Sequence, residues 1–245
     1  MDSKIIKDIR YYELKPIDYQ ENYDGHLGNI YHDSPDTKYI GQRIARKLNE
    51  FGFISGEFDH IYINLSPILN ENEINESDVF LDKRIKYFNC GVTTTVFNNL
   101  SEFEKDNKIK DITFNVLHWI YKTDDLKTHL INNVKNLLDK FDKHLSIQYK
   151  THETASYRID LSFQIRPETD KSKLIIEYIN KKENNTLQDI LDILDYEDLY
   201  SLIDKVSSKN GFIVFQPKKN HHAELVAAKY NSFMTGINLE EMAQK

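Results

Sequence analysis

The stretch that decides the fold is Ser156-Tyr-Arg-Ile-Asp-Leu-Ser-Phe-Gln-Ile-Arg166. Apolar and polar residues alternate without a break along it, so that Tyr157, Ile159, Leu161, Phe163 and Ile165 share one face. Successive side chains of a strand point to opposite faces, and a clean alternation is typical of an antiparallel sheet with one face buried and one in water. The stretch therefore predicts a strand of an antiparallel sheet.

The polar face of the same strand is the predicted partner-binding surface. It carries Arg158, Asp160, Gln164 and Arg166. Arginine is enriched at protein interfaces because its planar guanidinium makes paired hydrogen bonds. The alternative is a solvated face whose ion pairs stay within the sheet and contribute about 0–1 kcal/mol each.

Composition and charge narrow the classes of protein to which the chain can belong. It has 245 residues, 40% of them apolar, and a formal net charge of −7. That charge disfavours nucleic acid or an anionic membrane as the general partner, and it favours a protein partner. The single cysteine, Cys90, excludes an intramolecular disulfide and a cysteine-rich zinc site, and we expect no cofactor. Without an apolar run long enough for a signal peptide or a membrane helix, we expect a cytoplasmic protein.

The order of the expected elements indicates an α+β fold, with mainly antiparallel sheets and amphipathic helices packed on one side. We expect residues 58–65 and 84–91 to pair antiparallel across an acidic loop, and residues 145–180 to form a three-stranded meander. Apolar residues recur at helical spacing in the first half, and Thr186 with Asp189 resembles a capping box. The remaining expected elements are a strand over 8–16, helices over 35–51, 108–122, 125–142, 186–206 and 222–234, and a buried strand over 211–217.

The domain organisation stays open between two arrangements. We expect one domain over 1–245, because no proline- or glycine-rich linker separates the halves. The alternative is a division into 1–142 and 143–245.

Few side chains are placed for catalysis. His221 and His222 are adjacent near a predicted helix start, where neighbours point about 100° apart and rarely bind one metal ion. Asp59 and His60 are adjacent on a predicted strand, where they would face opposite sides. We therefore expect no metal site and no acid–base pair at these positions.

Two other features have the residue types of a reactive centre. Cys90 precedes a glycine and has no basic neighbour on its face, which favours a buried, inert thiol. Asp160 and Glu177 resemble the acidic pair of a restriction-endonuclease-like core, but the expected lysine position holds Ile179. No nucleophile elbow, phosphate loop or dinucleotide fingerprint is present.

Residues 58–67 (Phe-Asp-His-Ile-Tyr-Ile-Asn-Leu-Ser-Pro), 84–91 (Arg-Ile-Lys-Tyr-Phe-Asn-Cys-Gly) and 97–100 (Phe-Asn-Asn-Leu) resemble bacterial toxin-neutralising immunity proteins over about 38–140. The resemblance carries no diagnostic motif and transfers no functional residue. It implies a cytoplasmic protein that binds and inhibits a cognate toxin. The alternative function is that of an enzyme, a hydrolase or nuclease, with a site near Asp160 and Glu177 or near His221 and His222.

Overall fold

The computed structural model describes residues 4–14, 25–78, 81–167, 169–230 and 236–244. The fold is α+β, as predicted. The chain forms two compact units, Met1–Leu145 and Ser146–Lys245, whose boundary lies close to the alternative division at 142/143. None of the helices within the described ranges is long and apolar enough to cross a membrane.

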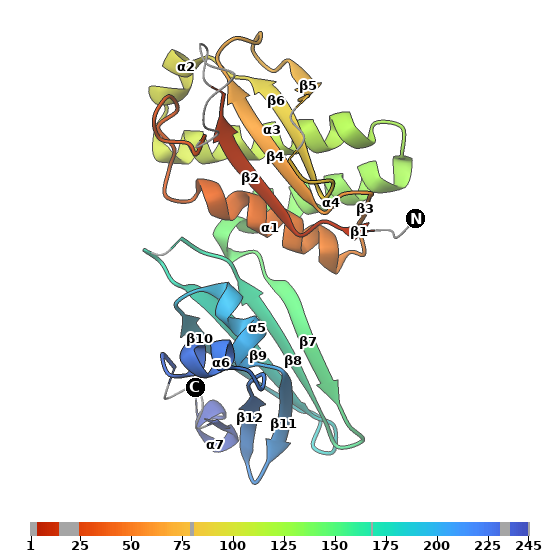
Figure 1. The fold of residues 1–245 in the computed structure, drawn as a ribbon. Coiled ribbons are helices and arrows are strands. Elements are labelled where there is room, and N and C mark those ends of the chain that lie inside the picture. Colours follow the sequence, from red (N-terminus) through yellow and green to blue (C-terminus); the bar gives the residue numbers. More distant parts are fainter. Residues whose placement is uncertain (1–3, 15–24, 79–80, 168, 231–235, 245) are drawn as a thin grey trace. The chain divides into compact units, whose positions relative to one another are not determined.

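The N-terminal unit is built on a four-stranded sheet with the order β2-β4-β6-β5 (Figure 1). Strands β2, β4 and β6 run parallel, and β5 is antiparallel to β6. Its strands are β1 (Lys4–Ile5), β2 (Asp8–Glu13), β3 (Ile54–Gly56), β4 (His60–Ser66), β5 (Ile74–Glu76) and β6 (Ile85–Gly91); its helices are α1 (Thr37–Glu50), α2 (Thr94–Asn98), α3 (Glu102–Tyr121), α4 (Asp125–Phe141) and the 3₁₀ turn η1 (Asp142–His144).

The parallel pairing of β4 and β6 corrects the antiparallel pairing expected for these segments. The acidic loop between them contains β5, which occupies the antiparallel position beside β6, with Ile74 opposite Cys90. The other edge of β6 is then left to β4. Gly91 allows the loop to pass over the end of β6, because a Cβ there would overlap the Asn70 carbonyl oxygen.

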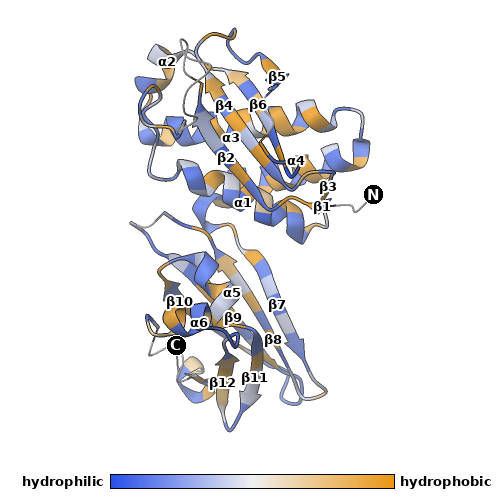
Figure 2. Ribbon diagram, viewed as in Figure 1, coloured by the Kyte–Doolittle hydropathy of each residue, from blue (hydrophilic) through white to orange (hydrophobic). Residues whose placement is uncertain are grey.

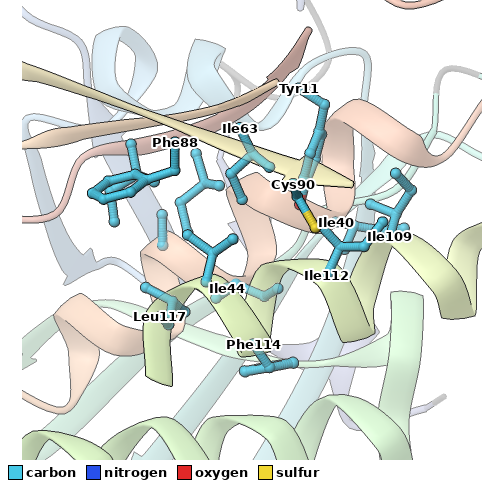
Figure 3. Close-up of a cluster of buried hydrophobic side chains, with 14 of the residues drawn as sticks. Tyr11, Ile40, Ile44, Ile63, Phe88, Cys90, Ile109, Ile112, Phe114 and Leu117 are labelled. Carbon is cyan, nitrogen blue, oxygen red and sulfur yellow. The ribbon is translucent and has the colours of Figure 1, made fainter. Parts of the chain in front are cut away.

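The hydrophobic core of this unit lies between the sheet and helices α1, α3 and α4 (Figure 3). Ile61, Ile63 and Leu65 project into it from the central strand β4, which Figure 2 shows as largely apolar. The predicted helices over 35–51 and 125–142 are present. Helix α3 begins six residues before the expected start at 108, because Ser101 and Glu104 form a capping box ahead of its apolar residues.

The C-terminal unit contains the predicted meander, extended to four strands in the order β10-β9-β8-β7, and a small sheet in the order β11-β12-β13. All neighbouring strands of both sheets are antiparallel. The elements are β7 (Ile147–Glu153), β8 (Tyr157–Gln164), β9 (Ser172–Asn180), β10 (Asn185–Ile193), η2 (Tyr196–Asp198), α5 (Leu199–Leu202), β11 (Lys205–Lys209), β12 (Phe212–Gln216), α6 (His221–Ala227), β13 (Ile237–Asn238) and α7 (Leu239–Met242).

The helix expected over 186–206 is wrong over most of its length, because residues 185–193 form β10 and only 196–202 are helical. Thr-Leu-Gln-Asp-Ile-Leu-Asp-Ile fits a helical and a strand period almost equally well. Pairing with β9 over nine residues satisfies the backbone and directs Leu187, Leu191 and Ile193 to the sheet interior. Tertiary pairing therefore overrides the local helical signal.

The last two expected elements are partly confirmed. Strand β12 lies between β11 and β13, as predicted for an inner strand, although only Ile213 and Phe215 of it are buried. Helix α6 begins at His221 and ends at Ala227. The remainder of the expected helix, up to residue 234, falls mostly in 231–235, which lie outside the described residues.

Candidate protein-binding face

Strand β8 lies inside the four-stranded sheet, and its register places the predicted binding residues on the face away from the core. Arg158 is opposite Glu153 of β7 and Ile179 of β9, and Asp160 is opposite Thr151 and Glu177. Directly opposed residues share a face. We call this surface the outer face; its members are Thr151 and Glu153 (β7), Arg158, Asp160, Ser162 and Gln164 (β8), Lys173, Ile175, Glu177 and Ile179 (β9), and Thr186, Gln188, Ile190 and Asp192 (β10).

The opposite, inner face of the sheet packs against the rest of the C-terminal unit. Ile159, Leu161 and Phe163 are buried there, and Phe163 stacks on Tyr196 with ring centroids 5.6 Å apart. Tyr149 donates to the carbonyls of Leu199 and Ile203 at 3.1 and 3.0 Å, which fastens α5 to this side. Helices α5 and α6 are both seen in front of the sheet in Figure 1. By contrast, every member of the outer face is exposed or half-buried.

Arg158 and Asp160 form an ion pair within the outer face. Arg158 Nη2 donates to Asp160 Oδ1 at 3.0 Å, and Nε lies 2.6 Å from Oδ2. Thr151 Oγ1 also donates to Asp160 Oδ1, at 2.5 Å. The Arg158 side chain remains 43% exposed and that of Asp160 16%. The guanidinium is therefore held in position by the sheet while a large part of it faces solvent.

Gln164 and Arg166 lie at the other end of β8 and differ from Arg158 in exposure. Arg166 follows the end of the strand, and its Nη2 donates to Gln164 Oε1. Its Nη1 lies 3.5 Å from Asp170 Oδ1, and the side chain is only 11% exposed. The expectation that both arginines face water therefore describes Arg158 better than Arg166.

An apolar pair on the outer face, shared by β9 and the edge strand β10, was not predicted from the sequence. Ile175 and Ile190 are directly opposite each other on β9 and β10, and Ile190 is 55% exposed. Beside them Lys173 Nζ donates to Asp192 Oδ1 at 2.6 Å, and this bond lowers the pKa of the Asp192 carboxyl. Isoleucine at alternate outward positions of 173–179 was the available signal. This signal did not reveal the partner residue Ile190, because residues 186–206 are predicted from the sequence to form a helix.

The acidic pair considered for catalysis is brought together by the fold. Asp160 and Glu177 are directly opposite on β8 and β9. The Asp160 carboxylate, however, already accepts hydrogen bonds from Arg158 and Thr151 within the sheet. This arrangement accounts for Asp160 as the acceptor in an outer-face ion pair.

His221 and His222 lie at the start of α6, as predicted, and both are exposed. Asn220 caps the helix by accepting from Ala223 N at 2.8 Å. His221 Nδ1 lies 3.7 Å from Glu224, with both side chains in solvent. Within the described part of the chain no group of three or more histidine, cysteine, aspartate or glutamate side chains is placed to hold a metal ion.

Asp59 and His60 do contact each other, contrary to the expectation that they face opposite sides. Strand β4 begins only at His60, so Asp59 lies before the alternating region, and His60 Nδ1 approaches its Oδ1 at 2.7 Å. Lys7 Nζ lies 2.7 Å from the other carboxylate oxygen. Burial alone would raise the pKa of Asp59, but the bonds from Lys7 and His60 lower it. The carboxylate therefore stays ionised and ties the start of β4 to the segment before β2.

Cys90 is buried, as expected, and burial raises the pKa of its thiol to about 11. The neutral thiol packs in the core of the N-terminal unit (Figure 3). Comparison of the chain with protein-family models, with curated proteins and with solved structures yields no match.

Proposed function

We propose that this chain is a non-catalytic binding protein, and specifically a bacterial immunity protein that inhibits a cognate toxin by covering part of its surface. The proposal combines the sequence resemblance over residues 38–140 with the outer face of the C-terminal unit. In it the outer face is the contact surface, and Arg158, Asp160, Gln164 and Arg166 belong to that surface. A cytoplasmic location and independence from cofactors are parts of the same proposal.

The observation that carries the proposal is the one-sided packing of the four-stranded sheet. Its inner face holds the core, while the outer face has the apolar pair Ile175 and Ile190 on β9 and β10, with the Lys173–Asp192 ion pair beside it and the Arg158–Asp160 ion pair on β8. Interfaces between proteins commonly have an apolar centre and a polar rim. A few central residues usually account for most of the binding energy, so the isoleucines are the expected anchors.

The nature of the partner follows from charge. The outer face carries two cations (Arg158, Lys173) and four anions (Glu153, Asp160, Glu177, Asp192), on a chain with a formal net charge of −7. Such a surface has no excess positive charge to hold phosphates or anionic lipid headgroups. A protein surface with its own apolar patch is the partner that fits.

The test uses the full-length chain as bait in its host, followed by a growth assay. We expect one stoichiometric protein partner, and we expect that co-expression of the chain restores growth of cells producing that partner. Ile190→Lys should abolish both capture and rescue. The control is Leu225→Lys on α6, because Leu225 is exposed to nearly the same extent (57%) and lies in the same unit but not in the four-stranded sheet.

Rescue by Ile190→Lys at the wild-type level would contradict the assignment of the outer face. A partner that is harmless to cells would contradict the immunity function while leaving a binding function in place. Far-UV circular dichroism of each variant serves to confirm that the fold is retained.

A further inference from the structure

A groove in the C-terminal unit lies between two strands that each end a sheet. Strand β7 is the last strand of the four-stranded sheet, and β11 is the last strand of the small sheet. The groove has a volume of about 430 Å³ and is lined by Lys150, Thr151 and His152 from β7 and by Asp204, Lys205, Val206, Ser207 and Gln216. This volume is within the usual range of about 300–1,000 Å³ for ligand sites.

Hydrogen bonds made by side chains connect the two sides of the groove at both of its ends. At one end Lys150 Nζ donates to the carbonyls of Ile203, at 3.0 Å, and Asp204. At the other end Ser208 N donates to Tyr157 Oη at 3.0 Å, and Tyr157 Oη lies 3.4 Å from His152 Nε2. Lys150 thus lies near residue 204, and Tyr157, which contacts His152, lies near residue 208. We infer that β7 and β11 run in the same general direction.

The backbone groups of β7 that face the groove follow from its hairpin with β8. Thr154 N donates to Tyr157 O at 2.8 Å, which makes 154 and 157 a hydrogen-bonded pair. Such pairs alternate with non-bonded pairs along an antiparallel ladder, so Glu153 and Thr151 belong to non-bonded pairs. The N–H and C=O of Thr151 therefore point away from β8 and into the groove.

The same reasoning applies to β11. Asn210 and Gly211, with φ of +52° and +79°, form the two-residue turn between β11 and β12, so 209 and 212 are a hydrogen-bonded pair. Residues 208 and 206 then direct their backbone groups away from β12. The bond from Ser208 N to Tyr157 Oη confirms this direction. Val206 consequently presents its N–H and C=O away from β12, and Val206 and Thr151 both line the groove.

From the backbone N–H and C=O groups of Thr151 and Val206 we infer a peptide-binding site: the groove takes an extended, acidic peptide segment of a partner by strand addition, antiparallel to both β7 and β11. Exposed strand edges pair readily with a further strand, and this is a recurring mode of peptide recognition. The segment Lys205–Ser207 is about 10 Å long by the usual rise of a strand, so the site accommodates about three residues.

The preference for an acidic segment comes from the charges that line the groove. Lys150 and Lys205 face one aspartate, Asp204, which leaves a formal charge of +1 with His152 neutral. The whole chain carries −7, so the groove is a local positive region on an acidic protein. A carboxylate on the bound segment completes the charge balance at Lys205.

The test measures binding of the acetylated and amidated peptide Thr-Val-Glu-Val-Thr to the full-length protein, by fluorescence anisotropy and by ¹⁵N-resolved NMR. We expect saturable binding with amide shifts concentrated at Thr151 and Val206. Lys205→Glu should weaken binding by about tenfold, the equivalent of about 1.4 kcal/mol from a lost attraction and an added repulsion. Lys209→Glu is the matched control, because Lys209 is an exposed lysine on the same strand outside the groove; it should leave the affinity unchanged.

Replacing the backbone N–H groups of the two peptide valines by N-methyl groups tests strand addition without changing the protein. We expect that the methylated peptide does not bind. Equal binding of the methylated peptide, or no saturable binding at about 1 mM peptide, a Kd equivalent to about −4 kcal/mol, would overturn the inference. Equal effects of Lys205→Glu and Lys209→Glu would overturn the acidic preference. None of these outcomes depends on Ile190 or on the toxin partner.

Discussion

Replacement of Phe163 by alanine should destabilise the C-terminal unit and leave the N-terminal unit unchanged. Phe163 is buried, stacks on Tyr196 with an interplanar angle of 14°, and lies edge-on to Tyr149 at 6.1 Å. Phenylalanine-to-alanine changes in cores typically cost about 3–5 kcal/mol through lost burial and the cavity left behind. The two ring contacts, each worth about 0.5–1.5 kcal/mol, place this site in the middle of that range, at about 4 kcal/mol.

The assay exploits the single tryptophan of the chain. Trp119 lies on α3 beside Phe88, so its fluorescence reports unfolding of the N-terminal unit, whereas far-UV circular dichroism reports both units. With a urea m-value of about 1.5 kcal/mol/M, a loss of about 4 kcal/mol lowers the unfolding midpoint by about 2.5–3 M. We expect this shift in part of the dichroism signal and no shift in the fluorescence transition.

Two outcomes would refute this reasoning. A fluorescence midpoint that moves together with the dichroism midpoint would show that the two units unfold as one cooperative block. A loss below about 1 kcal/mol would show that Phe163 is not packed as described.

Phe163→Leu, with an expected loss of about 1–1.5 kcal/mol in the free energy of unfolding, replaces the alanine variant if that variant does not fold. Ile190→Ala, on the exposed side of the same sheet, should cost less than about 1 kcal/mol.

Three further predictions concern the N-terminal unit. Burial raises the pKa of Asp106 to about 6, against the opposing bond from Ser34, so the protonated carboxyl stabilises the fold at low pH and that contribution is lost as pH rises through about 6. Asp106→Asn should therefore raise the free energy of unfolding by about 1–2 kcal/mol at pH 8, after discounting for partial exposure, and change little at pH 4, as measured by urea titration. Cys90 should not react with a thiol reagent at pH 8 until urea unfolds the protein, because its thiol stays neutral and buried. Gly91→Ala should lower the free energy of unfolding by about 1–3 kcal/mol, because the added methyl group overlaps the Asn70 carbonyl oxygen. Urea or thermal unfolding measures this loss.

The strands that could be predicted from the sequence are those with long alternation. Residues 157–164 alternate over eight positions and form a strand with the expected faces, and the expected strand over 173–180 is present as β9. Residues 185–193 contain apolar residues at spacings that suit a helix as well. Only the presence of β9 beside them decides for a strand, and a single sequence does not contain that information locally.

The pairing of β4 and β6 was unpredictable for a different reason. Both segments were recognised as strands, but their relative direction depends on β5, a strand of three residues inside an acidic loop. A three-residue strand gives almost no periodic signal. The contact between Asp59 and His60 depended in turn on where β4 begins, and the ends of elements are the least certain part of any sequence-based assignment.

The candidate site was predictable in part for the same reasons. Arg158 and Asp160 could be placed on one face because they lie on β8, the best-defined strand of the chain. Ile190 could not be added to that face without β10, and the groove beside β7 depends on the position of β11, whose first two residues fall in the helix expected over 186–206. Residues on one strand could be placed together from the sequence, and so could Asp160 and Glu177 on neighbouring strands of the meander, but residues that meet across β10 or β11 could not.

The ion pairs of the outer face determine how a partner would gain affinity there. Arg158 with Asp160 and Lys173 with Asp192 are already paired within the sheet, so a partner covering them desolvates balanced pairs without gaining strong new ones. Their contribution is to exclude surfaces with an unbalanced charge, which is specificity more than affinity. Affinity has to come from the apolar area around Ile190 and Ile175. In the proposed complex, Ile190→Lys should therefore act mainly on the dissociation rate, whereas Arg158→Glu should change the association rate and its salt dependence.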